Sequence, residues 1–200
     1  MPLSNVQKGA IGQLTFLATA LVTGRGQVEA YSAVADNEGR DAEIRRHLMS
    51  MAGISIQVKV AFYLFKYIHR KGRLLSIVFR LAAERVQNDP RLWYFFAYYD
   101  QKELRFQNPV FLIPSEVFHR IGRQGTKGRT WFVFNANMAA DSRDKWTPYR
   151  VAPKDLGKRL LEIVDSAALT AATKPGALPS DGVWLARKQR TEKGRLRRAA

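Results

Sequence analysis

The alternation of hydrophobic and polar positions predicts a helix at the start of the chain and strands after it. Apolar side chains recur at helical spacing from about residue 5 to Thr23, with Ser4 or Asn5 as the cap and Gly24 as the stop. The stripe expected to be buried consists of Ile11, Leu14, Leu17, Ala18, Leu21 and Val22. Residues 54–60 alternate with period 2, which predicts a strand with one buried face.

The rest of the chain adds short strand patterns and two further helices. Strands are expected at 27–34, at 41–44, at 74–81, at 92–99, at 109–113 and at 131–134, and helices at 114–121 and 153–169. This order predicts an α/β domain with a mixed, mostly antiparallel central sheet flanked by helices. We expect that domain to span residues 1–170, followed by a basic and flexible tail at 171–200.

Charge is the bulk property that says most about partners. Lys and Arg outnumber Asp and Glu by 33 to 17, which gives a formal charge of +16 and favours polyanionic partners. DNA is the expected partner, RNA is an open alternative, and dispersed basic residues argue against a membrane. The absence of cysteine excludes disulfides and thiolate-bound metals and agrees with a cytoplasmic location. A homodimer stays open.

Candidate chemistry is concentrated between Asp41 and Lys59. Gln57 and Lys59 are two positions apart in the period-2 segment and therefore share one strand face. Pairing with the strand at 41–44 brings the Asp41 carboxylate toward them. Asp41, Gln57 and the backbone carbonyl of Val58 are oxygen donors of the kind that Mg²⁺ or Mn²⁺ prefers. Lys59 can orient water and neutralise a phosphate, so the pattern indicates phosphodiester hydrolysis.

Three segments together resemble the PD-(D/E)XK nuclease superfamily. They are 8–13 on the first helix (KGAIGQ), 39–41 (GRD) and 56–59 (IQVK), and the branch they are most similar to contains homing endonucleases and Holliday-junction resolvases. The resemblance implies a restriction-endonuclease-like fold and Mg²⁺-dependent endonuclease activity on DNA. It also implies that Asp41 is a metal ligand, that Gln57 takes the position of the second acidic ligand, and that Lys59 is the catalytic lysine. Gln13 would lie where a glutamate is frequent.

The two amides at positions that are commonly carboxylates leave an alternative open, a DNA- or RNA-binding protein that keeps the fold without hydrolysis. Cations expected to contact nucleic acid are Lys8, Arg40, Lys66, Arg70, Lys71, Arg123, Lys127 and Arg129. The aromatic and basic run at 63–73 suits base stacking, although an amphipathic segment with inward-packed rings and solvated cations is the favoured explanation. Residues 119–129 are expected to form a basic loop, and His47, His69 and His119 lack metal-ligand spacing.

Overall fold

The computed structural model describes residues 2–32, 40–48, 53–66, 72–81, 89–124 and 130–172, and the side chains of 123, 124, 130 and 168–172 are outside that description. The chain divides into two compact units, Met1–Ala168 and Leu169–Ala200. All strands of the described residues belong to the first unit. The tail predicted at 171–200 lies outside the described residues, apart from the end of the last helix.

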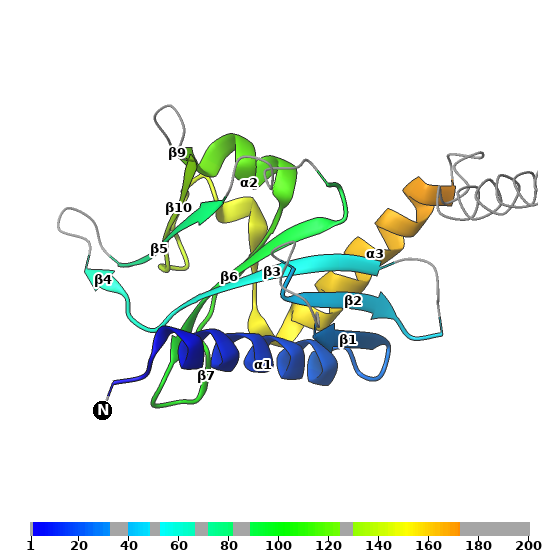
Figure 1. Ribbon diagram of the computed structural model, residues 1–200, viewed down its shortest axis with the longest axis horizontal. Helices are drawn as coiled ribbons and strands as arrows, with labels where there is room; N and C mark the ends of the chain where they lie inside the picture. Colours follow the sequence, from blue (N-terminus) through cyan, green and yellow to red (C-terminus); the bar gives the residue numbers. More distant parts are fainter. Residues whose placement is uncertain are drawn as a thin grey trace, which may run out of the picture. The chain divides into compact units, whose positions relative to one another are not determined.

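A large mixed sheet forms the centre of the first unit (Figure 1). Its strands are β1 (Val28–Ser32), β2 (Ala42–Arg46), β3 (Gly53–Ala61), β6 (Leu92–Asp100), β8 (Val110–Pro114) and β11 (Arg150–Val151), in that spatial order, with β7 (Arg105–Phe106) paired to β6. The β3–β6 pair is parallel and its neighbours are antiparallel. The predicted α/β class with a mixed, mostly antiparallel sheet is confirmed.

A second, smaller sheet packs beside the first and was not predicted as a separate layer. It contains β4 (Phe65–Lys66), β5 (Arg73–Leu81), β10 (Thr130–Asn137) and β9 (Arg123–Gln124) in that order. The pairing of β5 with β10 joins residues 49 to 63 positions apart along the chain, from Thr130 opposite Leu81 to Asn137 opposite Leu74. These two longer strands were expected, but local periodicity does not say which strands pair.

Helix α1 (Asn5–Thr23) covers one face of the large sheet and begins and ends where the sequence predicts. Ser4 and Gln7 form a reciprocal capping box at its start, and Gly24 caps its end. The predicted buried stripe is confirmed only in part, because Ile11 and Leu17 pack against the core but the buried residues of the helix are Gly12, Phe16 and Ala20. The expected stripe members Leu14, Leu21 and Val22 are 65%, 44% and 77% exposed. The helix is apolar nearly all round, so periodicity alone could not choose the face.

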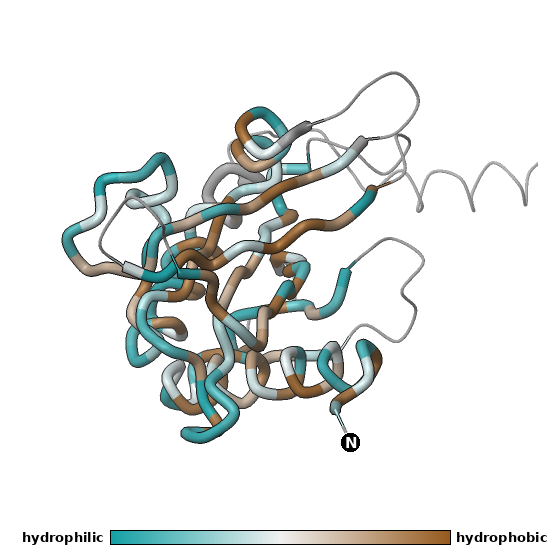
Figure 2. The backbone as a smooth tube through the Cα atoms, turned by 90° about the vertical axis from the view of Figure 1, so that its left-hand side faces the viewer, coloured by the Kyte–Doolittle hydropathy of each residue, from teal (hydrophilic) through white to brown (hydrophobic). Residues whose placement is uncertain are grey.

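Two apolar cores lie on opposite faces of the large sheet. The strands carry long hydrophobic stretches, which are brown in Figure 2. The first joins Phe16, Phe95 and the even-numbered β3 residues to helix α3 (Leu156–Ala172), which follows the short 3-10 turn η4 (Pro153–Asp155). The second joins Tyr94, Phe96 and Phe111 to the small sheet, to helix α2 (Ser115–Gly122) and to Trp146, just before η3 (Thr147–Tyr149). The prediction that β3 buries only one face is therefore wrong, since the small sheet covers part of the other.

Two further expectations are corrected by side-chain positions. His119 belongs to α2 rather than to a loop, is 6% exposed, and its Nε2 lies 2.9 Å from the Tyr94 hydroxyl. Tyr63 and Phe65 do not pack inward, because they are 60% and 46% exposed and lie edge to face against each other. No helix in the described part of the chain is long and apolar enough to cross a membrane.

Candidate active site

The register of β2 and β3 carries Asp41 to the position expected from the sequence. Ala42 pairs with Ile56 in antiparallel register, so the next residue outward, Asp41, stands opposite Gln57. The backbone N–H of Asp41 donates to the Ile56 carbonyl at 3.0 Å, which anchors this residue at the end of the ladder. The predicted approach of Asp41 to the Gln-x-Lys segment is thus present in the backbone.

The Asp41 carboxylate ends the ladder by accepting a backbone hydrogen bond. Its Oδ2 accepts from the Val58 N–H at 2.7 Å, where a carbonyl of a longer β2 would otherwise pair. Gln13 on α1 lies on the other side of the same residue, because its Nε2 donates to the Asp41 carbonyl oxygen and, at 2.9 Å, to Ser32 Oγ. Gln13, Asp41 and Val58 are therefore joined by direct hydrogen bonds.

The Val58 carbonyl oxygen is directed toward the same edge of β3 as its N–H. In an extended strand the N–H and C=O of one residue point toward the same neighbouring strand. Since the Val58 N–H reaches Asp41, its carbonyl also faces the side where the described part of β2 has ended. This oxygen, the Asp41 carboxylate and the Gln57 amide all belong to one short stretch of the sheet edge.

Gln57 and Lys59 lie on the same face of β3, as predicted. Ile54, Ile56 and Val58 alternate with them and point into the first core. Gln57 is only 5% exposed, whereas Lys59 is half-buried and its Nζ lies 5.5 Å from the centre of the Phe79 ring. The ring holds the ammonium group beside the sheet by a cation–π contact.

The oxygen atoms of the Asp41 carboxylate, the Gln57 amide and the Val58 carbonyl are chemically suited to a hard divalent cation. A carboxylate, an amide oxygen and a backbone carbonyl are ligands that Mg²⁺ accepts, and Mg²⁺ retains water when protein ligands are few. In the described part of the chain no three His, Cys, Asp or Glu side chains gather around a common point. Asp41 is consequently the single charged donor that this set offers.

Three of the carboxylates near the sheet edge are engaged elsewhere. Glu43 Oε1 accepts from Arg45 at 2.8 and 2.9 Å, and this hydrogen bond raises the Arg45 pKa. The Glu29 carboxylate lies 2.8 Å from the Tyr31 hydroxyl and 2.8 Å from His47 Nδ1. The hydrogen bond with Tyr31, and then the one with His47, lower the Glu29 pKa. Asp89 pairs with the arginine that precedes Asp41. None of these three carboxylates serves as a second acidic ligand beside Asp41.

The cations predicted to contact nucleic acid are dispersed over the structure. Lys8 is half-buried on α1, Arg40 directly precedes Asp41, and Lys66 is exposed on β4. Arg123 belongs to β9, but its side chain is not described. Four of the predicted residues lie outside the described part of the chain: Arg70, Lys71, Lys127 and Arg129.

Sequence reasoning predicted Arg40 as a nucleic-acid contact but missed the group of polar residues that Arg40 joins close to Asp41. Arg40 donates to Ser55 Oγ at 3.3 Å and to Asp89 Oδ2 at 3.2 Å. Arg91 lies next to Asp89 and is exposed. The presence of Ser55 two positions before Gln57 was a local signal for this group. Asp89 and Arg91 come from a distant segment, and their approach depends on the parallel pairing of β3 with β6.

Comparison with known proteins adds little to this geometry. No protein-family model and no curated protein match the chain. Among solved structures, the chain is similar to a bacterial homing endonuclease, I-Ssp6803I, with a TM-score of 0.49 and 16% sequence identity. The alignment covers 86% of this chain and 99% of the other. A likeness at this score and identity is too weak to carry an argument about function.

Proposed function

We propose that this protein is a metal-dependent endonuclease that hydrolyses phosphodiester bonds in DNA. The observation that carries the proposal is the end of the β2–β3 ladder. There the Asp41 carboxylate accepts a hydrogen bond from the Val58 N–H. By the strand register, Asp41 lies opposite Gln57, which shares one face of β3 with Lys59. The proposed ligands of Mg²⁺ or Mn²⁺ are the Asp41 carboxylate, the Gln57 side-chain oxygen and the Val58 carbonyl.

Each residue has a distinct proposed task. A bound divalent cation would supply Lewis-acid stabilisation of the phosphate and a more acidic water. Lys59 stabilises the negative charge that develops on the phosphate and orients the attacking water, with its ammonium group kept near the sheet by Phe79. Gln13 is a positioning residue, because its amide fixes the backbone of Asp41 through the carbonyl oxygen. The Val58 N–H fixes the carboxylate itself.

The assignment of DNA as substrate relies on charge. A formal charge of +16 attracts a polyanion and predicts binding that weakens steeply as salt rises. Hydrolysis and binding are separable, so each needs its own measurement.

The test is cleavage of supercoiled plasmid and branched DNA with Mg²⁺ by the wild type, Asp41→Asn and Lys59→Met. Asparagine keeps an oxygen acceptor for the Val58 N–H, so Asp41→Asn removes charge with little disturbance of the ladder. We expect each variant to lose activity by about 100-fold or more, as is typical for removal of an acid–base or charge-stabilising group. Asp141→Asn and Lys158→Met, both at exposed positions, are the matched controls. Equal cutting by all five proteins contradicts the proposed site.

A DNA- or RNA-binding protein without hydrolysis is the second candidate, and two observations favour it. Gln57 is 5% exposed, and the Gln13 amide is already used by Asp41 and Ser32. This candidate predicts salt-sensitive binding that is unchanged by metal removal, together with no activity in Gln57→Glu or Gln13→Glu. Under the nuclease proposal, the added carboxylate of Gln57→Glu strengthens metal binding.

A further inference from the structure

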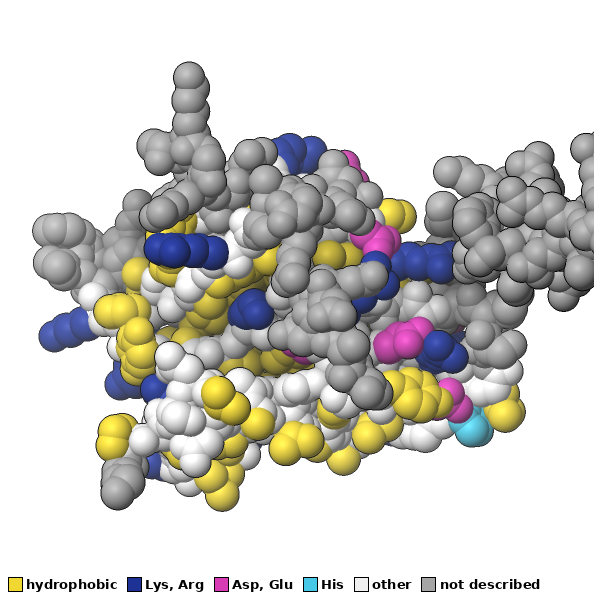
Figure 3. Space-filling model, in the orientation of Figure 1, with side chains coloured by type: hydrophobic (Ala, Val, Ile, Leu, Met, Phe, Trp, Pro, Cys, Tyr) yellow, Lys and Arg dark blue, Asp and Glu magenta, His cyan; other side chains and the backbone are white. Residues whose placement is uncertain are grey.

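A polar pocket of about 580 Å³ opens on the large sheet beside the candidate active site. Its charged and hydroxyl-bearing lining residues are Arg40, Glu43, Arg45, Ser55, Asp89 and Arg91. Acidic and basic side chains lie close together over the β1–β2 part of the sheet (Figure 3). Three guanidinium groups against two carboxylates give this lining a net charge of +1.

Two of the three guanidinium groups in the pocket, those of Arg40 and Arg45, are held by contacts within the protein. The Arg40 guanidinium is fixed between Ser55 and Asp89, and the other Asp89 oxygen accepts from the backbone N–H of Arg91 at 2.8 Å. Arg45 uses its Nε and one terminal nitrogen on a single Glu43 oxygen. An arginine has five N–H donors, so the Glu43 contacts of Arg45 leave donors for a ligand.

Arg91 is the cation of this pocket that is available to a ligand. Its side chain is exposed, and within the described part of the chain it forms no ion pair. By contrast, the Arg40 and Arg45 side chains are 41% and 39% exposed and each faces a carboxylate. A ligand with one negative charge would restore the balance between the three arginines and the two acidic groups.

Gly53 keeps the floor of the pocket open. A Cβ at this position would lie 3.0 Å from Glu43 Oε1 and 3.2 Å from Arg45 Cγ. Any side chain here would press on the pair that holds the Arg45 guanidinium. The glycine therefore allows the Glu43–Arg45 pair to lie close against β3.

The pocket and the candidate active site share one strand face. Ser55 lies two residues before Gln57, which is about 7 Å along a strand. Arg40 is followed directly by Asp41 in the chain, so the two sites are also adjacent just before β2 begins. Successive phosphates of one DNA strand are separated by about 3.4 Å along the helix axis, so the two sites are one or two nucleotides apart.

We propose that Arg40, Arg45 and Arg91 bind the phosphate one or two nucleotides from the phosphate that is hydrolysed. This inference rests on the proposed function, because the candidate active site defines the reference phosphate. The planar guanidinium fork matches phosphate oxygens, and a bound phosphodiester brings the one negative charge that the lining lacks. The pocket thereby sets the register of the DNA strand over Asp41 and Lys59.

The first experiment measures binding of a short DNA duplex in EDTA, as a function of salt, by the wild type and Arg91→Ala. Arg91→Ala is expected to bind about tenfold more weakly and to lower the slope of log K against log salt by about 0.9, the value for one phosphate contact. Arg143→Ala, which removes an exposed arginine from a different loop, is the control and changes binding less. Equal effects of the two substitutions, or no effect of Arg91→Ala, overturn the proposal.

The second experiment identifies the phosphate with duplexes that carry a single uncharged methylphosphonate at successive positions. Wild-type binding is expected to drop at one position in particular, and Arg91→Ala is expected to lose that sensitivity. If the wild type also cuts DNA, the sensitive position is one or two nucleotides from the cut, and a more distant position overturns the proposal. A wild type that shows the sensitivity but never cuts refutes the nuclease function while leaving a phosphate pocket.

Discussion

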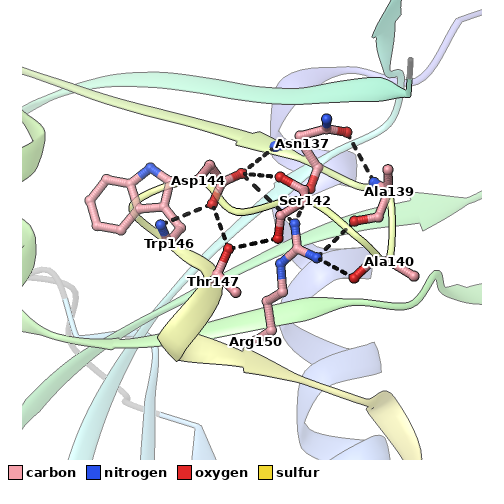
Figure 4. Close-up of polar contacts among 8 residues, drawn as sticks. All are labelled: Asn137, Ala139, Ala140, Ser142, Asp144, Trp146, Thr147 and Arg150. Atoms are coloured by element: carbon pink, nitrogen blue, oxygen red, sulfur yellow. Dashed lines mark hydrogen bonds and ion pairs between the residues drawn. The ribbon is translucent and has the colours of Figure 1, made fainter. Parts of the chain in front are cut away.

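Asp144 holds together the loop between β10 and β11 (Figure 4). The stability that is lost when its carboxylate is removed can be estimated from its hydrogen bonds. Its Oδ2 accepts from the Asn137 N–H at 2.8 Å and from Ser142 Oγ at 3.3 Å. Its Oδ1 accepts from the Trp146 N–H at 2.9 Å. The Arg150 guanidinium lies 3.8 Å away, and the Asp144 and Arg150 side chains are only 20% and 12% exposed.

We expect Asp144→Ala to lower the free energy of unfolding by about 3 kcal/mol. Hydrogen bonds to a charged group contribute about 1.5–3 kcal/mol each, and two backbone N–H groups lose their acceptor. Water replaces part of that loss, because a fifth of the Asp144 side chain is exposed. For a domain of this size, about 3 kcal/mol corresponds to a fall in Tm of about 6–12 °C.

The assay is urea unfolding followed by tryptophan fluorescence, because Trp146 is fully buried and belongs to the loop that Asp144 holds. Asp141→Ala is the matched control, since Asp141 is exposed three residues earlier in the same loop. The midpoint is expected to shift for Asp144→Ala, whereas the stability of Asp141→Ala is expected to stay within about 0.5 kcal/mol of wild type. Indistinguishable midpoints would refute the reasoning that the carboxylate holds the loop.

Two further predictions concern α1 and β1. Gly12→Ala is expected to destabilise the protein, because its Cβ would lie 2.8 Å from Val60 Cγ2, whereas Gly9→Ala meets nothing within 4 Å and should stabilise the helix by about 0.5–1 kcal/mol. Thermal unfolding of the two variants checks this opposite sign. The Glu29 pKa is lowered on folding, so its contribution to stability is present above its unfolded value of 4.5 and is lost as pH falls through the folded value. Glu29→Gln should therefore show a smaller loss of Tm than wild type between about pH 5 and pH 3.

The sequence predicted most of the longer elements, because their signals are local. Ser4 gives the start of α1, Gly24 gives its end, and the alternation through Gln57 and Lys59 gives β3. The buried face of α1 was not predictable, since Leu14 and Phe16 are equally apolar. The side that packs is decided by Gly12, which lets the helix approach Val60.

The sequence could predict only those contacts of the candidate site that follow from the pairing of neighbouring strands. The approach of Asp41 to Gln57 follows from one antiparallel register between neighbouring strands. The hydrogen bond from Val58 to the carboxylate depends on where β2 ends, and the Arg40–Asp89 pair joins residues 49 positions apart. Such contacts are fixed by the tertiary arrangement, and no period in the chain indicates them.

The central claim, that Asp41, Gln57 and Val58 form a metal site, is tested most directly by a crystal structure of the protein grown with Mn²⁺, using the anomalous signal of the metal. The account predicts a single strong peak at the end of the β2–β3 ladder, within bonding distance of Asp41 Oδ1, the Gln57 side-chain oxygen and the Val58 carbonyl oxygen. A peak at another set of residues, or no peak at a Mn²⁺ concentration that supports cleavage, would contradict it.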